Sequence, residues 1–289
     1  MAHAHGNYYV PHGSHWPIVG SVGLFTTMLG VASWLNDMSF GMPVFFAGLA
    51  IVLFMMFGWF GTVIRESEGG MYSQWVDKSF RWGMMWFIFS EVMFFSAFFG
   101  ALFYARHYSV PWLGAETPHG FWTHLMLWKG FEAQWPTNGP ANVGGAFESM
   151  GAWGLAAINT AILLSSGVTV TIAHHALKAN KRGLLIVGLL ATVILGFTFV
   201  GLQAHEYHEA YTAMNMKLST GIYGSTFFML TGFHGAHVTI GAIMLTVILM
   251  RCIKGHFTPD HHFAFEAVAW YWHFVDVVWL GLFIFVYWL

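Results

Sequence analysis

One carboxylic acid lies inside a long apolar run and is the residue of this sequence best placed to do chemistry. Glu91 follows Trp82 by nine residues, which is about 13 Å along a helix axis and close to the middle of a bilayer. A carboxylate at that depth has to be protonated, hydrated or paired. Glu91 therefore has two interpretations: part of a proton relay or a polar anchor for a partner, or a protonated structural carboxyl bonded to another helix.

A second group of polar residues lies near the C-terminus. Glu266, His273 and Asp276 are offset by seven and three residues, which places them within about 80° around one helix. This stripe is expected to face the bundle interior or a partner protein rather than lipid.

His234 and His237 lie one helical turn apart in the preceding apolar run. Such a pair can ligate haem or copper, or form hydrogen bonds within a helix interface. The spacing does not require a haem. With Cys252 as the only cysteine, a thiolate-bridged copper pair and a Cys-x-x-Cys-His haem attachment are excluded.

The composition indicates the kind of element that holds these residues. Hydrophobic residues make up 57% of the 289 residues and charged residues 8%, and the mean hydropathy is +0.59. A soluble domain has about 25% charged residues, so the chain is predicted to be a polytopic membrane protein. The net charge of −2 gives no basic surface for nucleic acid.

Seven runs are long enough to span a bilayer as helices. They are apolar throughout, whereas the strands of a β-barrel would alternate. Met1–His15 has no Lys or Arg and no small-x-small cleavage site follows, so a retained first helix is predicted rather than a cleaved signal. The predicted spans are Trp16–Trp34, Met42–Ile64, Trp82–Tyr104, Met150–Ile172, Leu184–Gln203, Ile222–Met250 and Ala264–Leu289.

The basic residues predict the orientation. Three connections, between the second and third, fourth and fifth, and sixth and seventh spans, hold most of the 11 Lys and Arg residues. The positive-inside rule then places the N-terminus inside and the C-terminus outside.

One connection on the predicted outer side is long, from Ala105 to Ser149. Within it, Pro118–Glu132 is predicted to form a short helix with Phe121, Leu125, Trp128 and Glu132 roughly on one face. We expect this helix to cap the bundle or lie at the interface. Pro136–Gly145 is rich in Gly, Pro and Asn and is predicted to be irregular.

A cluster of cations and hydroxyls lies on the predicted inner side. Phospholipid head groups suit such residues at this depth, although ordinary positive-inside loop charge explains them equally well. The cluster consists of Arg65 and Glu66 after the second span, and of Arg251, Lys254, His256, Thr258 and His261 between the sixth and seventh.

Three stretches in particular carry a family resemblance that extends over nearly the whole chain. They are Phe80–Phe95 (FRWGMMWFIFSEVMFF), Gly224–His237 (GSTFFMLTGFHGAH) and His261–Trp279 (HHFAFEAVAWYWHFVDVVW). In these residues the chain resembles subunit III of the haem–copper cytochrome c oxidases. The outer loop departs from the family pattern, so no contact of that loop is carried over.

The resemblance implies an all-α bundle of seven transmembrane helices that forms a single domain over residues 1–289. In this family the first two helices, here about 16–64, are splayed from the other five, here about 82–289, and phospholipids fill the cleft. The resemblance also implies that the chain itself binds no haem, copper or other metal, because these lie in subunits I and II. The family's intramembrane carboxyl falls on Glu91. Its lipid contacts fall on Arg65, Glu66, Arg251, His256, Thr258, His261 and Phe263.

The function implied is that of a non-redox core subunit of a proton-pumping oxidase that transfers electrons from cytochrome c to O2. The subunit would bind lipid, stabilise subunit I and support its proton uptake. Two alternatives stay open: subunit III of a quinol-oxidising enzyme, and an independent proton or ion carrier using Glu91, His273 and Asp276. A haem-binding subunit using His234 and His237 is a third. A bacterial plasma membrane is the expected location, and a mitochondrial inner membrane is the other candidate.

Overall fold

A computed structural model describes residues 13–289 of the chain. Most of Met1–His15, on which the retained-helix prediction depended, lies outside the described residues. The described part is helical throughout its regular structure, as predicted, and contains seven helices long and apolar enough to cross a membrane. The chain divides into two compact units, residues 1–80 and 81–289.

The described residues of the first unit form a helical hairpin. Its helices are α1 (Trp16–Leu35) and α2 (Gly41–Glu68). The helices approach closely where glycines replace side chains: a Cβ built on Gly48 would lie 2.3 Å from the backbone nitrogen of Thr27. Small residues allow membrane helices to pack backbone to backbone, and Thr27 itself is buried there.

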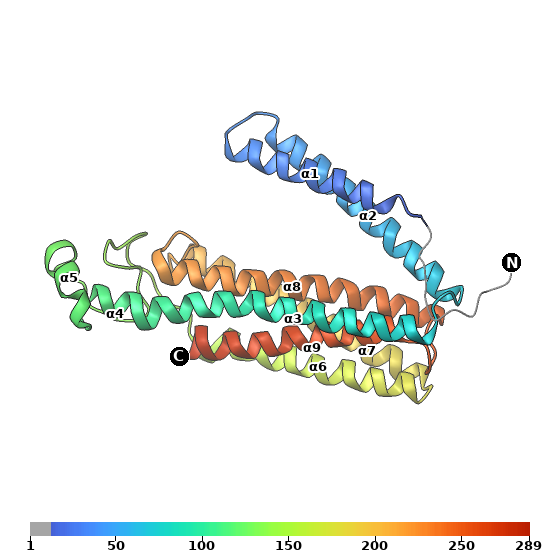
Figure 1. Ribbon diagram of the computed structural model, residues 1–289. Coiled ribbons are helices and arrows are strands. Elements are labelled where there is room, and N and C mark those ends of the chain that lie inside the picture. The colour runs from blue at the N-terminus through green and yellow to red at the C-terminus, as the bar shows by residue number, and fades with distance from the viewer. Residues whose placement is uncertain (1–12) are drawn as a thin grey trace. The chain divides into compact units, whose positions relative to one another are not determined.

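The second unit is a bundle in which α3, α6, α7, α8 and α9 run side by side (Figure 1). It begins within α3 (Gln74–Tyr104). The elements that follow are the π-helical turn η1 (Ala105–Ser109), α4 (Val110–Leu113), the 3-10 turn η2 (Pro118–Gly120), α5 (Phe121–Leu127), the π-helical turn η3 (Ala152–Ala156), α6 (Ala157–Lys178), α7 (Arg182–Thr212), α8 (Gly221–Lys254), α9 (Phe263–Leu282) and the π-helical turn η4 (Phe283–Trp288).

Two tryptophans of α9 occupy the centre of this bundle. Trp272 and Trp279 are completely buried, and their indole N–H groups donate to Ser166 Oγ at 2.8 Å and Thr160 Oγ1 at 2.9 Å on α6. Trp272 lies between two glycines, because a Cβ on Gly196 of α7 or on Gly241 of α8 would lie 2.8 Å from its ring. The packing of α6, α7 and α8 therefore fits around side chains of α9.

The third spanning segment is much longer than predicted. It continues from Gln74 through η1 and α4 to Leu113, a stretch of 40 residues and about 60 Å, twice the thickness of a hydrocarbon core. Toward the C-terminal part of this segment, Arg106 Nη2 donates to the carbonyl oxygen of Leu289. The end of the last helix therefore lies level with Arg106, and the segment from there to Leu113 extends further.

The short helix predicted in the outer loop is present, but its predicted extent is wrong. The helix α5 ends at Leu127, because Trp128 has φ −129° and ψ 39° and Gly130 has φ +104°, which favours glycine. Trp128 and Glu132 therefore lie beyond the helix, and the predicted face does not include them. The region Pro136–Gly145 is irregular as predicted.

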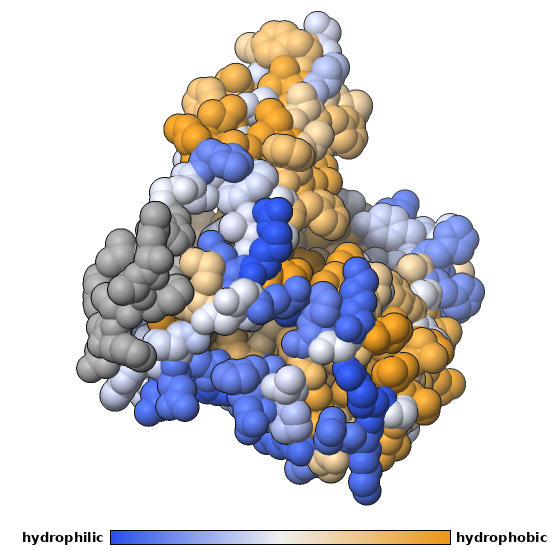
Figure 2. Space-filling view, turned by 90° about the vertical axis from the view of Figure 1, so that its right-hand side faces the viewer, coloured by the Kyte–Doolittle hydropathy of each residue, from blue (hydrophilic) through white to orange (hydrophobic). Residues whose placement is uncertain are grey.

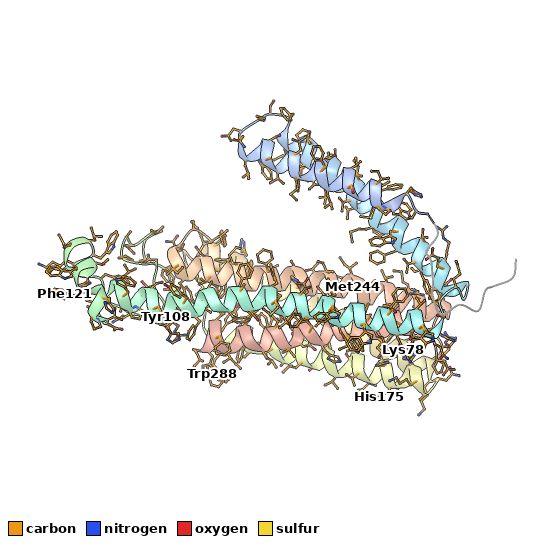
Figure 3. All side chains as sticks on the ribbon, viewed as in Figure 1. Lys78, Tyr108, Phe121, His175, Met244 and Trp288 are labelled. Carbon is orange, nitrogen blue, oxygen red and sulfur yellow. The ribbon has the colours of Figure 1, made fainter. Side chains whose placement is uncertain are left out.

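Hydrophilic and apolar side chains are separated on the surface of the bundle. Figure 2 looks onto its end that carries the α6–α7 connection, and hydrophilic residues gather there. His175 lies toward this end (Figure 3). The flanks carry large exposed apolar side chains such as Val187 and Ile194, as expected for surfaces that contact lipid.

The close approach in the hairpin predicts a difference between two glycines of α2. Gly48→Ala should raise hydrogen exchange of the α1 and α2 amides, because overpacking against Thr27 costs about 1–3 kcal/mol. Gly61→Ala is the control: nothing lies within 4 Å of its Cβ, so the substitution should leave exchange unchanged or slow it. Equal protection in the two variants would contradict the close contact.

Candidate functional site

Glu91 of α3 is paired with a histidine of α8. Its Oε2 lies 2.9 Å from Nε2 of His237, and the two side chains are 22% and 14% exposed. The structure thus pairs Glu91, which the sequence predicts to be an intramembrane carboxyl, with His237, which it predicts to be a residue of a helix interface. Each supplies the polar partner that the other needs in an apolar medium.

The second ring nitrogen of His237 decides where the proton of this pair can be. His237 Nδ1 lies 2.6 Å from the carbonyl oxygen of Phe233, and a carbonyl only accepts, so Nδ1 carries hydrogen. Nε2 then either accepts from a protonated Glu91 or, in an imidazolium, donates to a carboxylate. One proton is shared in both cases, and the pair has no net charge.

Aromatic rings enclose this pair. The ring of His237 lies 5.1 Å from Phe95 and 6.4 Å from Tyr271, centroid to centroid, with Tyr271 stacked. Phe95 is 2% exposed. These rings exclude water from the Glu91–His237 bond and thereby strengthen it.

Asp276 and His273, three residues apart on α9, form a second polar contact beside α6. Asp276 Oδ2 lies 3.6 Å from His273 Nδ1, and a Cβ on Gly167 would lie 2.4 Å from the same carboxylate oxygen. Thr171 donates its hydroxyl hydrogen to the carbonyl of Gly167 at 2.9 Å, so His273 Nε2 donates to Thr171 Oγ1 at 3.2 Å. His273 therefore bonds α9 to α6, and Asp276 packs against α6 at Gly167.

His234 is not paired with His237. It is fully buried, its Nε2 donates to the carbonyl oxygen of Val275 at 3.1 Å, and its ring packs on Trp279 and Phe199. Over residues 13–289 the structure brings together no group of three or more His, Cys, Asp or Glu side chains that could hold a metal ion.

Glu266 bonds a different helix from the other members of its predicted stripe. Arg81 of α3 donates to Glu266 Oε2 from Nη2 at 2.8 Å and from Nε at 3.2 Å. The Arg81 guanidinium also lies 5.6 Å from the ring centroid of Phe263. Glu266 therefore joins α9 to α3, whereas His273 joins α9 to α6 through Thr171.

The structure reveals one buried carboxyl that the sequence analysis did not select. Glu206 of α7 is 2% exposed and accepts a hydrogen bond from Tyr287 at 3.2 Å. Close by, Gln203 donates to the carbonyl of Thr231 at 2.9 Å, and Tyr207 bonds the Thr231 hydroxyl at 2.7 Å. Because the predicted span ended at Gln203, Glu206 fell in a connection. A helical pattern extended to Thr212 would have placed Glu206 on the same face as Gln203 and included it.

The residues predicted to bind lipid are divided between the two units. In the first unit, Arg65 donates to Thr62 at 3.3 Å, and Glu66 accepts from Tyr72 at 2.7 Å. In the second unit, the turn after α8 is closed by Thr258 and His261: Thr258 N donates to His261 O, and His261 N donates to Thr258 Oγ1.

Arg251 lies beside this turn at the end of α8. It is 8% exposed, and its guanidinium lies 4.4 Å from the ring centroid of Phe257. Its carbonyl accepts from the backbone N–H of His256 at 3.1 Å.

The fold and these contacts define an integral membrane protein whose polar groups join its helices. The cytochrome c oxidase subunit III family model matches residues 5–289. Similar proteins are named cytochrome c oxidase subunit 3. The relative from Struthio camelus is 42% identical over 289 residues, with 100% of this chain and 99% of the relative covered. That from Marchantia polymorpha is 42% identical over 276 residues, with 95% and 93% covered, and that from Drosophila melanogaster is 41% identical over 287 residues, with 99% and 98% covered.

The chain belongs to the cytochrome c oxidase subunit III family. It is a subunit of an oxidase complex whose catalysis lies in other subunits. The resemblance to this family is confirmed, and with it the main interpretation of the chain as subunit III of a cytochrome c oxidase.

The shared proton predicts energetic coupling across α3 and α8. Glu91→Ala and His237→Ala should each destabilise the contact, because each leaves a polar partner unbonded in an apolar site. The double variant should lose about 1–2 kcal/mol less than the sum of the single losses. Hydrogen exchange of α3 and α8 amides in the assembled oxidase measures these free energies. Ser90→Ala, next to Glu91, is the control, since Ser90 bonds only the carbonyl of Phe87 on its own helix; additive losses would contradict the coupling.

Proposed function

We propose that the chain is a non-redox core subunit of a proton-pumping oxidase, which stabilises subunit I and supports its proton uptake. The observation that carries this proposal is the Glu91–His237 contact. Both nitrogens of the histidine and one carboxylate oxygen are engaged within the chain. A group held in this way serves to fix α3 against α8.

The remaining polar contacts of the described helices support a structural role over an independent carrier. Arg81–Glu266 joins α3 to α9, His273 bonds Thr171 between α9 and α6, and Glu206 bonds Tyr287 in η4. A relay needs neighbouring groups that exchange protons in sequence. These are pairs, each of which secures a different helix contact.

The partners that we propose are subunits I and II, which hold the haem and copper, with cytochrome c as the electron donor to the complex. The quinol-oxidising complex is the alternative, and the electron donor is decided in subunit II rather than here. The relatives' names support the cytochrome c type. We propose a bacterial plasma membrane as the location, with the N-terminus inside and the C-terminus outside as the basic connections indicate.

We further propose that phospholipid head groups bind at Arg65, Glu66, Arg251, His256, Thr258, His261 and Phe263. The turn after α8 supports this role. Its reciprocal Thr258–His261 bonds close a turn whose hydroxyl and imidazole side chains are exposed, and Arg251 lies at the end of α8 just before this turn. A phosphate needs this combination of positive charge and hydrogen-bond donors.

The structural role predicts the behaviour of an oxidase carrying Glu91→Gln. The amide replaces a protonated carboxyl as a donor to His237, so assembly, initial O2 reduction and proton pumping should persist. Polarographic O2 uptake and pumping by the oxidase in vesicles measure these activities. Oxidase from which this chain has been removed should begin O2 reduction at a similar rate, but its proton uptake or its working lifetime should decrease.

The result that would overturn this assignment is complete loss of O2 reduction by Glu91→Gln in a fully assembled complex. Glu91 would then take part in the reaction itself. Proton or ion flux through the purified chain alone in vesicles would instead support the carrier. A Soret band from the isolated chain would support the haem-binding alternative.

The lipid site predicts selective loss of bound phospholipid. Thr258→Ala combined with His261→Ala should reduce the lipid retained by the purified oxidase, measured by native mass spectrometry, because both changes remove hydrogen-bonding groups from the turn. Lys178→Ala is a matched control, since it removes an exposed charge at the end of α6, outside the proposed lipid-binding residues. Equal lipid content in the unmodified oxidase, the double variant and the control variant would contradict the site.

A further inference from the structure

The chain beyond α3 carries large exposed apolar side chains. They belong to α4 and α5, and we call them the outer apolar patch: Trp112, Phe121, Trp122, Leu125, Met126 and Leu127. Their exposed fractions range from 42% at Leu125 to 75% at Met126. Figure 3 shows Phe121 beyond Tyr108, at the far end of this segment.

Contacts within the bundle indicate how far the outer apolar patch lies from the hydrocarbon core of the membrane. The Arg81–Glu266 ion pair marks one end of the spanning part of α3, and the Arg106 bond to Leu289 marks the other. These arginines are 25 residues apart, or about 38 Å, which already exceeds the roughly 30 Å of the hydrocarbon core.

The helix α5 lies above the second of these marks. Leu113 follows Arg106 by seven residues, about 10 Å along the axis. His124 Nδ1 lies 3.0 Å from the carbonyl oxygen of Leu113, and a Cβ on Gly120 would overlap the carbonyl of Trp112, so α5 is held at that level. Because a head-group layer is about 5–8 Å deep, lipid does not cover the patch.

The charge pattern distinguishes among protein partners. Between Arg106 and Lys129 the sequence contains one charged side chain, Glu116. A soluble electron donor that binds and leaves is guided by charge, which this surface lacks. Permanent interfaces are apolar and rich in Trp, Phe and Met, as this patch is.

The area is sufficient for a stable contact. At their exposed fractions, six side chains of this size offer about 700 Å². One partner in a standard interface contributes about 800 Å².

We propose that the outer apolar patch is an assembly surface, covered in the intact oxidase by an apolar surface on the extramembrane part of a permanently bound neighbouring subunit. The position above the head groups excludes lipid as its cover, and the shortage of charge excludes a mobile donor protein. The loop 105–149 then contributes to the assembly of the complex on its outer side.

Cysteine labelling of the assembled oxidase tests this proposal. Cys252 is the only cysteine and is buried, so the chain offers an unreactive background. Met126→Cys should react with a water-soluble maleimide at least roughly tenfold more slowly than Lys129→Cys, as expected for a site that reacts only through transient opening. Lys129 is the matched control because it is exposed three residues further along the same loop. Trp122→Cys repeats the measurement if Met126→Cys prevents assembly.

Separate conditions identify the cover. Protection should persist after detergent extraction of the intact complex and should not require added cytochrome c. A photoreactive side chain at position 126 should cross-link to one stoichiometric oxidase subunit other than this chain. Equal labelling of Met126→Cys and Lys129→Cys would overturn the proposal. Protection lost with lipid, protection gained only with cytochrome c, or a cross-link to a second copy of this chain would overturn it too.

Discussion

The hydrogen bond between Glu91 and His237 is the interaction on which the interior of this bundle depends. An apolar medium offers no water to an unpaired carboxyl or imidazole, so each of these groups requires the other. The carbonyl of Phe233 holds one ring nitrogen and leaves the other for Glu91. The bond joins helices that are far apart in the sequence, and the aromatic rings around it keep water away.

The same constraint explains the other polar contacts of the five-helix unit. Trp272 and Trp279 direct their indole N–H groups to hydroxyls of α6, and Glu206 accepts a hydrogen bond from Tyr287 near the C-terminal end of α7. Each contact fixes the rotation of one helix against another, which apolar packing among similar side chains specifies poorly. In a subunit of an oxidase whose catalysis lies elsewhere, polar groups that orient helices are consistent with a supporting function.

The sequence predicts the seven spans well because long apolar runs give a strong signal that does not depend on tertiary contacts. It also identifies Glu91 and His237 as residues that need partners, but their contact arises from packing between α3 and α8, which no local pattern encodes. Glu206 was not predicted as a buried carboxyl, because charged residues near the end of an apolar run are typical of the membrane–water interface. The end of α5 at Leu127 was missed because Gly130 takes a conformation that a pattern of apolar residues does not reveal.

The position of Trp272 between Gly196 and Gly241 has a consequence for the order in which the helices come together during biosynthesis. The space that receives its indole is formed by two helices jointly, α7 and α8, and neither alone provides both walls. The segment that carries this tryptophan follows both of these helices in the chain. The slot for its indole is therefore complete only once α7 and α8 have packed together, and that packing has to precede the seating of α9.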